Sequence, residues 1–114
     1  MGDFNEGPLT GSSQAVNLGP LYANSSPLVD CYSLPTFSVG NRPGTFDSCG
    51  LPNRFDYVFI SQSLQPFFQR GEVFRRGLWG SRKTRPTDWD TYPEMEDSTQ
   101  QASDHAAVVM ELSI

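Results

Sequence analysis

The sequence is poor in cysteine and has no long apolar run. Its 114 residues include two cysteines, Cys31 and Cys49. Two cysteines at ordinary spacing are too few for a disulfide scaffold or a zinc site, so both are predicted to be free thiols in a reducing compartment. No stretch reaches the roughly 20 apolar residues that cross a bilayer, and Met1–Glu6 is neither basic nor apolar enough for a signal peptide. These absences predict a cytoplasmic chain without a transmembrane segment.

Basic residues are also scarce, and the net charge of the chain is −5. A protein that coats nucleic acid by bulk electrostatics needs a basic surface, so that class of protein is excluded. Six of the 8 Lys and Arg residues nevertheless fall within residues 70–85, among aromatic side chains. In one interpretation this segment binds an anionic substrate through Arg75, Arg76 and Arg82. In the other, its arginines pair with the acidic run at residues 88–97.

Hydrophobic periodicity predicts strands in the second half of the chain. Residues 54–61 carry apolar side chains on both faces, as in a central strand, and residues 106–114 alternate with the period of two of a half-buried strand. Residues 45–48 and 54–61 flank the turn-rich Gly50–Asn53, which predicts a hairpin. Residues 71–79 predict a further strand.

Signals for helices and loops occupy other parts of the chain. Residues 12–18 predict a short helix that the following Gly-Pro pair ends. Ser26 as N-cap and Pro27 in the first turn predict a second helix that ends near Leu34. Residues 80–101 are rich in Pro, Thr, Ser and acidic side chains, and they predict a long surface loop. Strands interspersed with helices indicate an α/β domain.

Polar side chains suited to phosphate chemistry lie at the predicted strand ends. Asp3 and Asn5 are two residues apart, which in extended backbone places a carboxylate and an amide on one face. Asp56 lies at the start of a buried strand, where a carboxylate needs a partner. His105, the single histidine, follows Asp104 and precedes the last strand. A lone histidine is commonly structural, but catalytic side chains gather at such strand ends in α/β proteins.

The chemistry of these side chains predicts their roles. Asp3 can deprotonate an attacking water, and Asn5 can donate a hydrogen bond to an oxygen on which charge builds. Asp56 can hold His105 in one tautomer. Asp104 can bind a hard cation such as Mg²⁺. Such a set suits the hydrolysis of a phosphate ester.

Three short motifs, Gly2–Asn5, Arg54–Ser61 and Ser103–His105, follow one another along the whole chain. In order and rough spacing they resemble the last three motifs of the endonuclease/exonuclease/phosphatase superfamily, which includes deoxyribonuclease I, exonuclease III, sphingomyelinases and inositol polyphosphate 5-phosphatases. The resemblance implies the C-terminal half of a four-layered α/β sandwich, with a mainly antiparallel sheet and flanking helices. It also implies cleavage of phosphate esters with Mg²⁺ or Mn²⁺.

The resemblance assigns a role to each site residue. It implies that Asp3 activates or positions the nucleophilic water and that Asn5 contacts the scissile phosphate. His105, paired with Asp56, would stabilise the phosphate as charge develops. Asp104 and Asp3 would lie in the metal shell. The implied substrate is a phosphate ester such as a nucleic acid, a phospholipid or an inositol phosphate head group, because members of this superfamily select substrates through loops rather than through these motifs.

A part of the superfamily's site has no counterpart in this sequence. In the superfamily the Gly-Asp-Phe-Asn motif lies mid-domain, and the preceding half supplies an asparagine and a glutamate that bind the main metal. Residues 1–114 are therefore expected to be a C-terminal portion that exposes apolar surface and needs the N-terminal half or self-association. The main alternative is a non-catalytic binding or assembly module derived from the family, and a further one is chance similarity.

Overall fold

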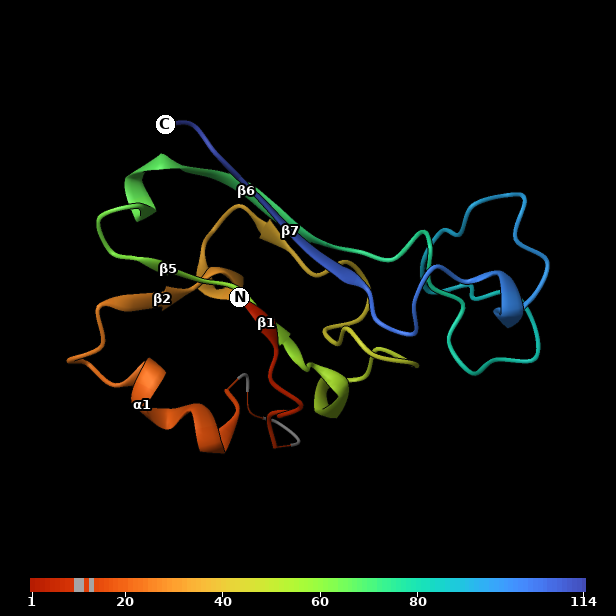
Figure 1. The fold of residues 1–114 in the computed structure, drawn as a ribbon, viewed down its shortest axis with the longest axis horizontal. Helices are drawn as coiled ribbons and strands as arrows, with labels where there is room; N and C mark the ends of the chain where they lie inside the picture. Colours follow the sequence, from red (N-terminus) through yellow and green to blue (C-terminus); the bar gives the residue numbers. More distant parts are fainter. Residues whose placement is uncertain (10–11, 13) are drawn as a thin grey trace.

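Seven short strands and one four-residue helix make up most of the regular structure of residues 1–9, 12 and 14–114, which the computed structural model describes. The two longest strands, β6 (Phe68–Phe74) and β7 (Ala107–Leu112), pair antiparallel, and β3 (Phe37–Ser38) pairs parallel with the other edge of β6. Figure 1 shows β6 and β7 running side by side. The strands predicted from periodicity at residues 71–79 and 106–114 are confirmed, although β6 begins and ends earlier than predicted.

Two further pairs of short strands are antiparallel. β1 (Gly2–Asp3) pairs with β4 (Asp56–Tyr57), and β2 (Leu28–Asp30) pairs with β5 (Phe59–Ser61). Only Val58 separates β4 from β5, so the predicted central strand is one extended segment that changes partner at that residue. The described part of the chain is thus a mixed α/β domain that is mostly sheet.

The helix predicted after Ser26 is wrong. Residues Leu28–Asp30 form strand β2, and a single 3-10 turn, Cys31–Ser33, follows it. The hydroxyl of Ser26 does accept a hydrogen bond from the N–H of Leu28 at 3.2 Å, so the capping contact forms without a helix. Pairing with β5 and burial of the strand outweigh the local Ser-Pro signal, because tertiary contacts override propensity.

The strand predicted at residues 45–48 is also wrong. Phe46 forms an isolated bridge with His105 rather than a hairpin with the central strand, and Leu51–Asn53 is a 3-10 turn. The N–H groups of Thr45 and Phe46 both donate to the carbonyl of Asn53 at 3.0 Å, which keeps this loop beside the start of β4.

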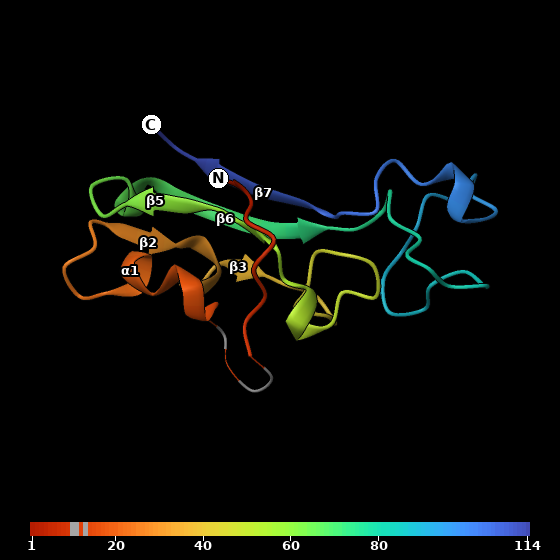
Figure 2. The same ribbon diagram turned by 60° about the horizontal axis from the view of Figure 1, so that its bottom comes forward.

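Helical structure is sparse. A 3-10 turn at Val16–Leu18 leads into α1 (Gly19–Tyr22), and further 3-10 turns lie at Gln65–Phe67 and Ser98–Gln100. The helix predicted at residues 12–18 falls partly outside the described residues, and α1 begins where that helix was expected to end. Figure 2 shows α1 beside β2, which it contacts. None of the described helices has the length and apolar character needed to cross a membrane.

The apolar side chains form two buried clusters that share Phe37 as a partly buried neighbour. The first cluster contains Cys31, Leu34, Val58 and Ile60, and the second contains Cys49, Val73, Leu78 and Ala106. Both cysteines are free thiols, which confirms the prediction that they form no disulfide. The second cluster buries side chains from both ends of the long connection between β6 and β7.

That connection, residues 75–106, forms a lobe at one end of the molecule (Figure 1). Its regular structure is a single 3-10 turn, in agreement with the predicted surface loop. Two indoles hold its first part together: Trp79 Nε1 donates to the carbonyl of Arg82 at 3.1 Å, and Trp89 Nε1 donates to that of Leu78 at 2.9 Å. The loop is therefore packed by its own side chains, as in a compact surface loop.

Gly71 in β6 tests the packing between strands. A Cβ at this position would lie 2.5 Å from the ring of Phe37 and 3.0 Å from the carbonyl of Val109. The Phe37 ring stacks on Tyr32 with centroids 4.4 Å apart and cannot yield freely. Gly71→Ala should lower the free energy of unfolding by about 1–3 kcal/mol, measured by urea denaturation.

Gly50→Ala is the matched control, because its added Cβ would make only ordinary van der Waals contacts, at 3.6 Å or more, and Gly50 has extended backbone that alanine also adopts. It should leave the free energy of unfolding unchanged or raise it. An equal loss in both variants would contradict the described packing of β6.

Candidate active site

Strand pairing brings three separated segments together at one end of the β1–β4 pair. Asp3 lies opposite Asp56 in the antiparallel register, so the two carboxylates are neighbours. His105 reaches the same place through its bridge with Phe46. Residues at opposed positions of antiparallel strands lie about 4.5–5.5 Å apart, which suffices for their side chains to share a site.

Asp56 and His105 form the central contact. The Oδ2 atom of Asp56 lies 2.8 Å from Nδ1 of His105 and accepts a further hydrogen bond from the hydroxyl of Thr45 at 2.6 Å. An ionised carboxylate only accepts hydrogen bonds, so Nδ1 carries a proton and Nε2 faces away from Asp56. The predicted pairing of these two residues is therefore present, with the tautomer fixed.

Thr45 is a site residue that sequence reasoning missed. Its side chain is fully buried, and its hydroxyl accepts from the N–H groups of Phe55 and Asp56 at 3.1 and 3.2 Å while it donates to the Asp56 carboxylate. One hydroxyl thus fixes both the backbone and the side chain of Asp56. A single threonine in a turn-rich segment carries no sequence signal for such a role.

Asp3 places a second carboxylate near His105, on the side of the imidazole opposite Asp56. Its Oδ2 atom lies 3.8 Å from Nε2 of His105, beyond direct hydrogen-bond length, while its Oδ1 atom accepts the N–H of Asn5 at 2.8 Å. Asn5 has a positive φ of 51°, a conformation that asparagine tolerates better than most residues. This local turn replaces the extended backbone predicted for Asp3 and Asn5, yet it still keeps them in contact.

The surroundings of His105 are aromatic on one side and acidic on the other. The ring of Phe46 lies 4.9 Å from the imidazole, and that of Phe55 lies 6.5 Å from it. Partial burial lowers the pKa of His105, but the hydrogen bond and charge of Asp56, with the charges of Asp3 and Asp104, outweigh burial and raise the pKa above its ordinary value. The site therefore favours the imidazolium.

The same side chains form a group that could hold a metal ion. Ligand atoms of Asp3, Asp56 and His105 all lie within 4.8 Å of one another. The Asp56 Oδ2 and His105 Nδ1 atoms already bond each other, so Asp3 is the member whose carboxylate is most accessible, at 38% side-chain exposure. An exposed carboxylate fits Mg²⁺ or Mn²⁺, which commonly bind through one or two carboxylates and water.

Asp104, the other predicted metal ligand, lies outside that group of three. It is exposed, its backbone carbonyl accepts the N–H of Asp47 at 3.1 Å, and the residue is among those that line a neighbouring hollow. Its charge still acts on His105. The structure thus brings Asp3, Asn5, Asp56 and His105 together and leaves Asp104 at the rim.

Arg75, proposed from the sequence as a substrate contact, is buried at 5% exposure. Its guanidinium donates to the carbonyls of Val39 at 2.5 Å and Gly44 at 2.8 Å, and also to that of Arg42. Three backbone carbonyls on one guanidinium are the contacts of a side chain that holds a loop. We therefore assign Arg75 to fixing residues 39–44 and not to binding substrate.

Arg76 and Arg82 lie in the loop between β6 and β7. Arg76 is exposed with its guanidinium 4.8 Å from the ring centre of Tyr92. Arg82 pairs with Asp88 at 2.7 Å and lies 4.9 Å from the ring centre of Trp89. For Arg82 the acidic-run interpretation of the basic segment is confirmed, whereas Arg76 remains open to solvent.

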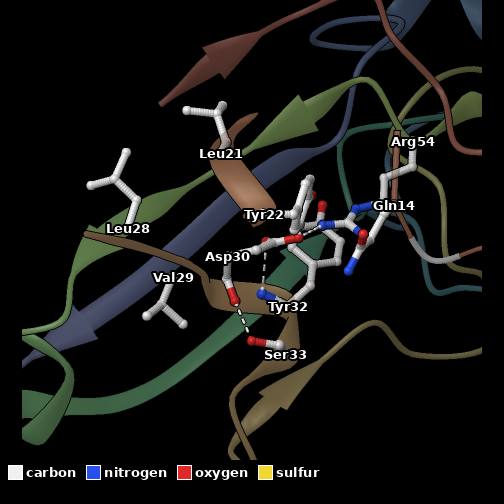
Figure 3. Close-up of a pocket in the computed structure, with 9 residues that line it drawn as sticks. All are labelled: Gln14, Leu21, Tyr22, Leu28, Val29, Asp30, Tyr32, Ser33 and Arg54. Carbon is white, nitrogen blue, oxygen red and sulfur yellow. Dashed lines mark hydrogen bonds and ion pairs between the residues drawn. The ribbon is translucent and has the colours of Figure 1, made fainter. Parts of the chain in front are cut away.

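A second polar cluster, which the sequence did not indicate, contacts the backbone of Asp56. The buried carboxylate of Asp30 pairs with the buried guanidinium of Arg54 and accepts from Tyr22 at 2.8 Å, beside a cavity of about 330 Å³ (Figure 3). Arg54 lies over the ring of Tyr32, whose hydroxyl donates to the backbone carbonyl of Asp56 at 3.2 Å. The cluster therefore connects the core to the backbone of Asp56, the residue that pairs with His105.

The chain was compared with protein-family models, curated proteins and solved structures, and none matches it.

The raised pKa of His105 predicts how stability depends on pH. The imidazolium is favoured in the folded state, so its stabilising effect is complete below the unfolded value of about 6.5 and is lost as pH rises through the raised folded value. His105→Gln should therefore lower the free energy of unfolding more at about pH 6 than at about pH 9. Urea denaturation of both proteins measures this difference, and a loss independent of pH would contradict the described ion pair.

The Asp30–Arg54 pair predicts a large loss of stability. Asp30→Ala removes the carboxylate from a buried guanidinium and should lower the free energy of unfolding by about 3–5 kcal/mol. The control is Glu111→Gln, which breaks the exposed pair of Glu111 with Arg70 and should cost less than about 1 kcal/mol. Similar losses in the two variants, measured by urea denaturation, would contradict the burial of the first pair.

Proposed function

We propose that the chain contributes the nucleophile-positioning and phosphate-binding half of a metal-dependent phosphoester hydrolase of the endonuclease/exonuclease/phosphatase superfamily. The observation that carries the proposal is the row Asp3, His105 and Asp56, in which an imidazolium stands between two carboxylates from separate segments. The resemblance of the three sequence motifs supports the same activity. The finer fold belongs to the proposal: the paired strands would form part of a four-layered sandwich.

Asp3 positions and deprotonates the attacking water in this proposal. Its Oδ1 atom is oriented by the N–H of Asn5, which leaves Oδ2 directed toward the gap of 3.8 Å to Nε2 of His105. A single oxygen atom at about 2.8 Å from both atoms can bridge such a gap. The gap therefore suits an oxygen of water or of the phosphate.

His105 stabilises the negative charge that develops on the phosphate. In the imidazolium form its Nε2–H donates toward the substrate while Nδ1–H stays bonded to Asp56. Charge-assisted hydrogen bonds to a phosphate are about twice as strong as neutral ones. Because Asp56 is itself fixed by Thr45, the imidazole is held in place before the substrate arrives.

Asn5 contributes a neutral donor. Its N–H is used by Asp3, but among the described residues its side-chain amide makes no hydrogen bond. The amide can therefore donate to a non-bridging oxygen of the phosphate on which charge builds. In an in-line displacement, the water oxygen would bond to phosphorus as its proton passes to Asp3 and the phosphoester bond to the leaving oxygen breaks, while Nε2–H of His105 stabilises the charge on the phosphate.

Mg²⁺ or Mn²⁺, bound through the carboxylate of Asp3, would supply positive charge to neutralise the phosphate. By the resemblance, the principal metal ligands belong to the other half of the site. This is the reason to expect weak activity from residues 1–114 by themselves and full activity only with that half present.

A non-catalytic assembly module is the second candidate. Large apolar side chains are exposed at Met1, Val109 and Ile114, at fractions of 84%, 46% and 93%. Exposed apolar surface can mark an interface with another chain. The geometry around His105 favours the hydrolase, because a module used only for assembly has no need of a partly buried carboxylate that orients an imidazole.

The test mixes the chain with the first half of a superfamily domain and Mg²⁺, using bis(p-nitrophenyl) phosphate and p-nitrophenyl phosphate as substrates. His105→Ala should lower the rate by at least about 100-fold, because a positioned acid or base contributes that much. Removal of Mg²⁺ by a chelator should abolish the rate.

Asp90→Asn is the control, since Asp90 is an exposed carboxylate that lines a different hollow. Its rate should equal that of the unmodified chain. A folded mixture that stays inert, or activity that survives His105→Ala, would refute the proposed hydrolase.

A further inference from the structure

Strand β7 forms one edge of the three-stranded sheet β3–β6–β7 and lies at the margin of the molecule (Figure 2). The N–H of Gly71 in β6 donates to the carbonyl of Thr36 at 3.3 Å, on the β3 side, so it points away from β7. Gly71 lies opposite Met110 in the antiparallel register. This is therefore a non-hydrogen-bonded pair, in which the N–H and C=O of Met110 point away from β6 and toward the outer edge.

The main-chain groups of Val108 and Leu112 point the same way, because these directions alternate along a strand. The N–H of Ser113 donates to the carbonyl of Phe67 at 2.9 Å, on the β6 side, which confirms the alternation at the end of β7. Among the described residues, no group bonds the outward N–H or C=O of Val108, Met110 or Leu112. We call these three residues the free edge of β7.

The start of β7 is covered, but the free edge is not protected. The N–H of Ala106 donates to the carbonyl of Thr45 at 2.6 Å, and a hollow of about 220 Å³ lies between β1 and the start of β7. Sheet edges that stay unpaired in natural proteins commonly carry Lys or Pro. Strand β7 contains neither, and Glu111 is its one charged residue. Its edge is therefore suited to pairing with an added strand.

The side chains of β7 also suit an added strand. Val108 and Met110 are partly buried and pack against the first buried cluster, whereas Ala107, Val109 and Glu111 alternate with them and are exposed. The exposed fraction of Val109 is 46%. A strand paired with the free edge would extend the inner, apolar face of the sheet and cover side chains that β6 covers on one side alone.

A second copy of β7 is complementary to the free edge. In an antiparallel pair with Met110 at the two-fold axis, Val108 lies opposite Leu112 of the second copy, and Met110 lies opposite Met110. All outward main-chain groups of the free edge then find partners, and all inner-face pairs are apolar. On the exposed face, Val109 lies opposite Glu111 of the second copy, so like charges do not meet.

Neighbouring registers of the same pair are less favourable. An axis at Glu111 would place two carboxylates directly opposite each other, which is destabilising. An axis at Val109 would require Leu112 to pair with Ala106, whose N–H is already bonded to Thr45. The free edge thus specifies one register for a copy of itself, as a two-fold interface requires.

We propose that β7 pairs antiparallel with β7 of a second copy of the chain, with Met110 at the two-fold axis. The two three-stranded sheets then form one continuous sheet. The inference goes beyond the proposed function and does not depend on it, because the free edge takes no part in the site at Asp3 and His105. The rival occupant is a strand from the first half of a superfamily domain.

The first experiment combines sedimentation velocity with amide hydrogen exchange measured by NMR, each at low and high concentrations of the unmodified chain. The mass should rise from monomer to dimer with concentration. The amides of Val108, Met110 and Leu112 should become protected as the dimer forms. Those of Val109 and Glu111 point toward β6 and should be protected at both concentrations.

Leu112→Pro tests the main-chain pairing. It removes an N–H that β6 does not use, and proline is tolerated on an edge strand where its nitrogen faces solvent, so the monomer stays folded. Leu112→Ala is the matched control, since it loses the leucine side chain but keeps the N–H. The proline variant should dimerise at least about tenfold more weakly than the alanine variant.

Val109→Glu and Val109→Lys test the register. Both place a charge at the same exposed position, opposite Glu111 of the second copy, and the pair occurs twice in a two-fold dimer. The glutamate variant should therefore have a dimer Kd roughly fivefold higher than the lysine variant. Equal values would contradict the proposed register.

Three results would overturn the inference. The chain could remain monomeric at all concentrations, or it could form a dimer in which the amides of Val108, Met110 and Leu112 stay unprotected. In the third, those amides would be protected only after addition of the first half of a superfamily domain, which would make that half the occupant. Each result leaves the proposed hydrolase to be judged by its own test at His105.

Discussion

The hydrogen bond between Asp56 and His105 is the constraint on which the site depends. It joins two residues 49 positions apart in sequence, at the place where β4 pairs with β1 and Phe46 bridges to His105. A half-buried carboxylate at a strand end needs compensation for lost hydration. Here the compensation comes from an imidazole and a threonine hydroxyl, so the interaction that satisfies Asp56 also orients His105.

Buried side chains of the core hold the backbone of Asp56 in place. Tyr32 bonds the backbone of Asp56 while its ring lies against Arg54, which in turn pairs with Asp30. A buried ion pair contributes little net stability compared with an apolar pair, but breaking it is costly. Here the ion pair connects β2 to the residue just before β4, and so helps to fix the position of the Asp56 carboxylate.

How much the sequence predicted depended on how local each signal was. Period-two patterns predicted β6 and β7, and strand-end polar residues predicted the meeting of Asp3, Asp56 and His105. The capping signal at Ser26 failed because long-range pairing of β2 with β5 overrode it. Thr45 was missed and Arg75 was taken for a substrate contact because burial and carbonyl partners depend on tertiary packing. The charge composition of a sequence predicts neither the burial of a side chain nor its hydrogen-bond partners.

The central claim is that Asp3, Asn5 and His105 together hold a phosphate undergoing in-line attack. A crystal structure of the chain with Mg²⁺ and orthovanadate, an analogue of that geometry, tests this most directly. The account predicts vanadate bound beside Asp3 and His105, with one oxygen hydrogen-bonded to Nε2 of His105 and another to the Asn5 amide. Vanadate bound elsewhere, at the basic residues of the loop for example, with the gap between Asp3 and His105 left to water, would contradict it.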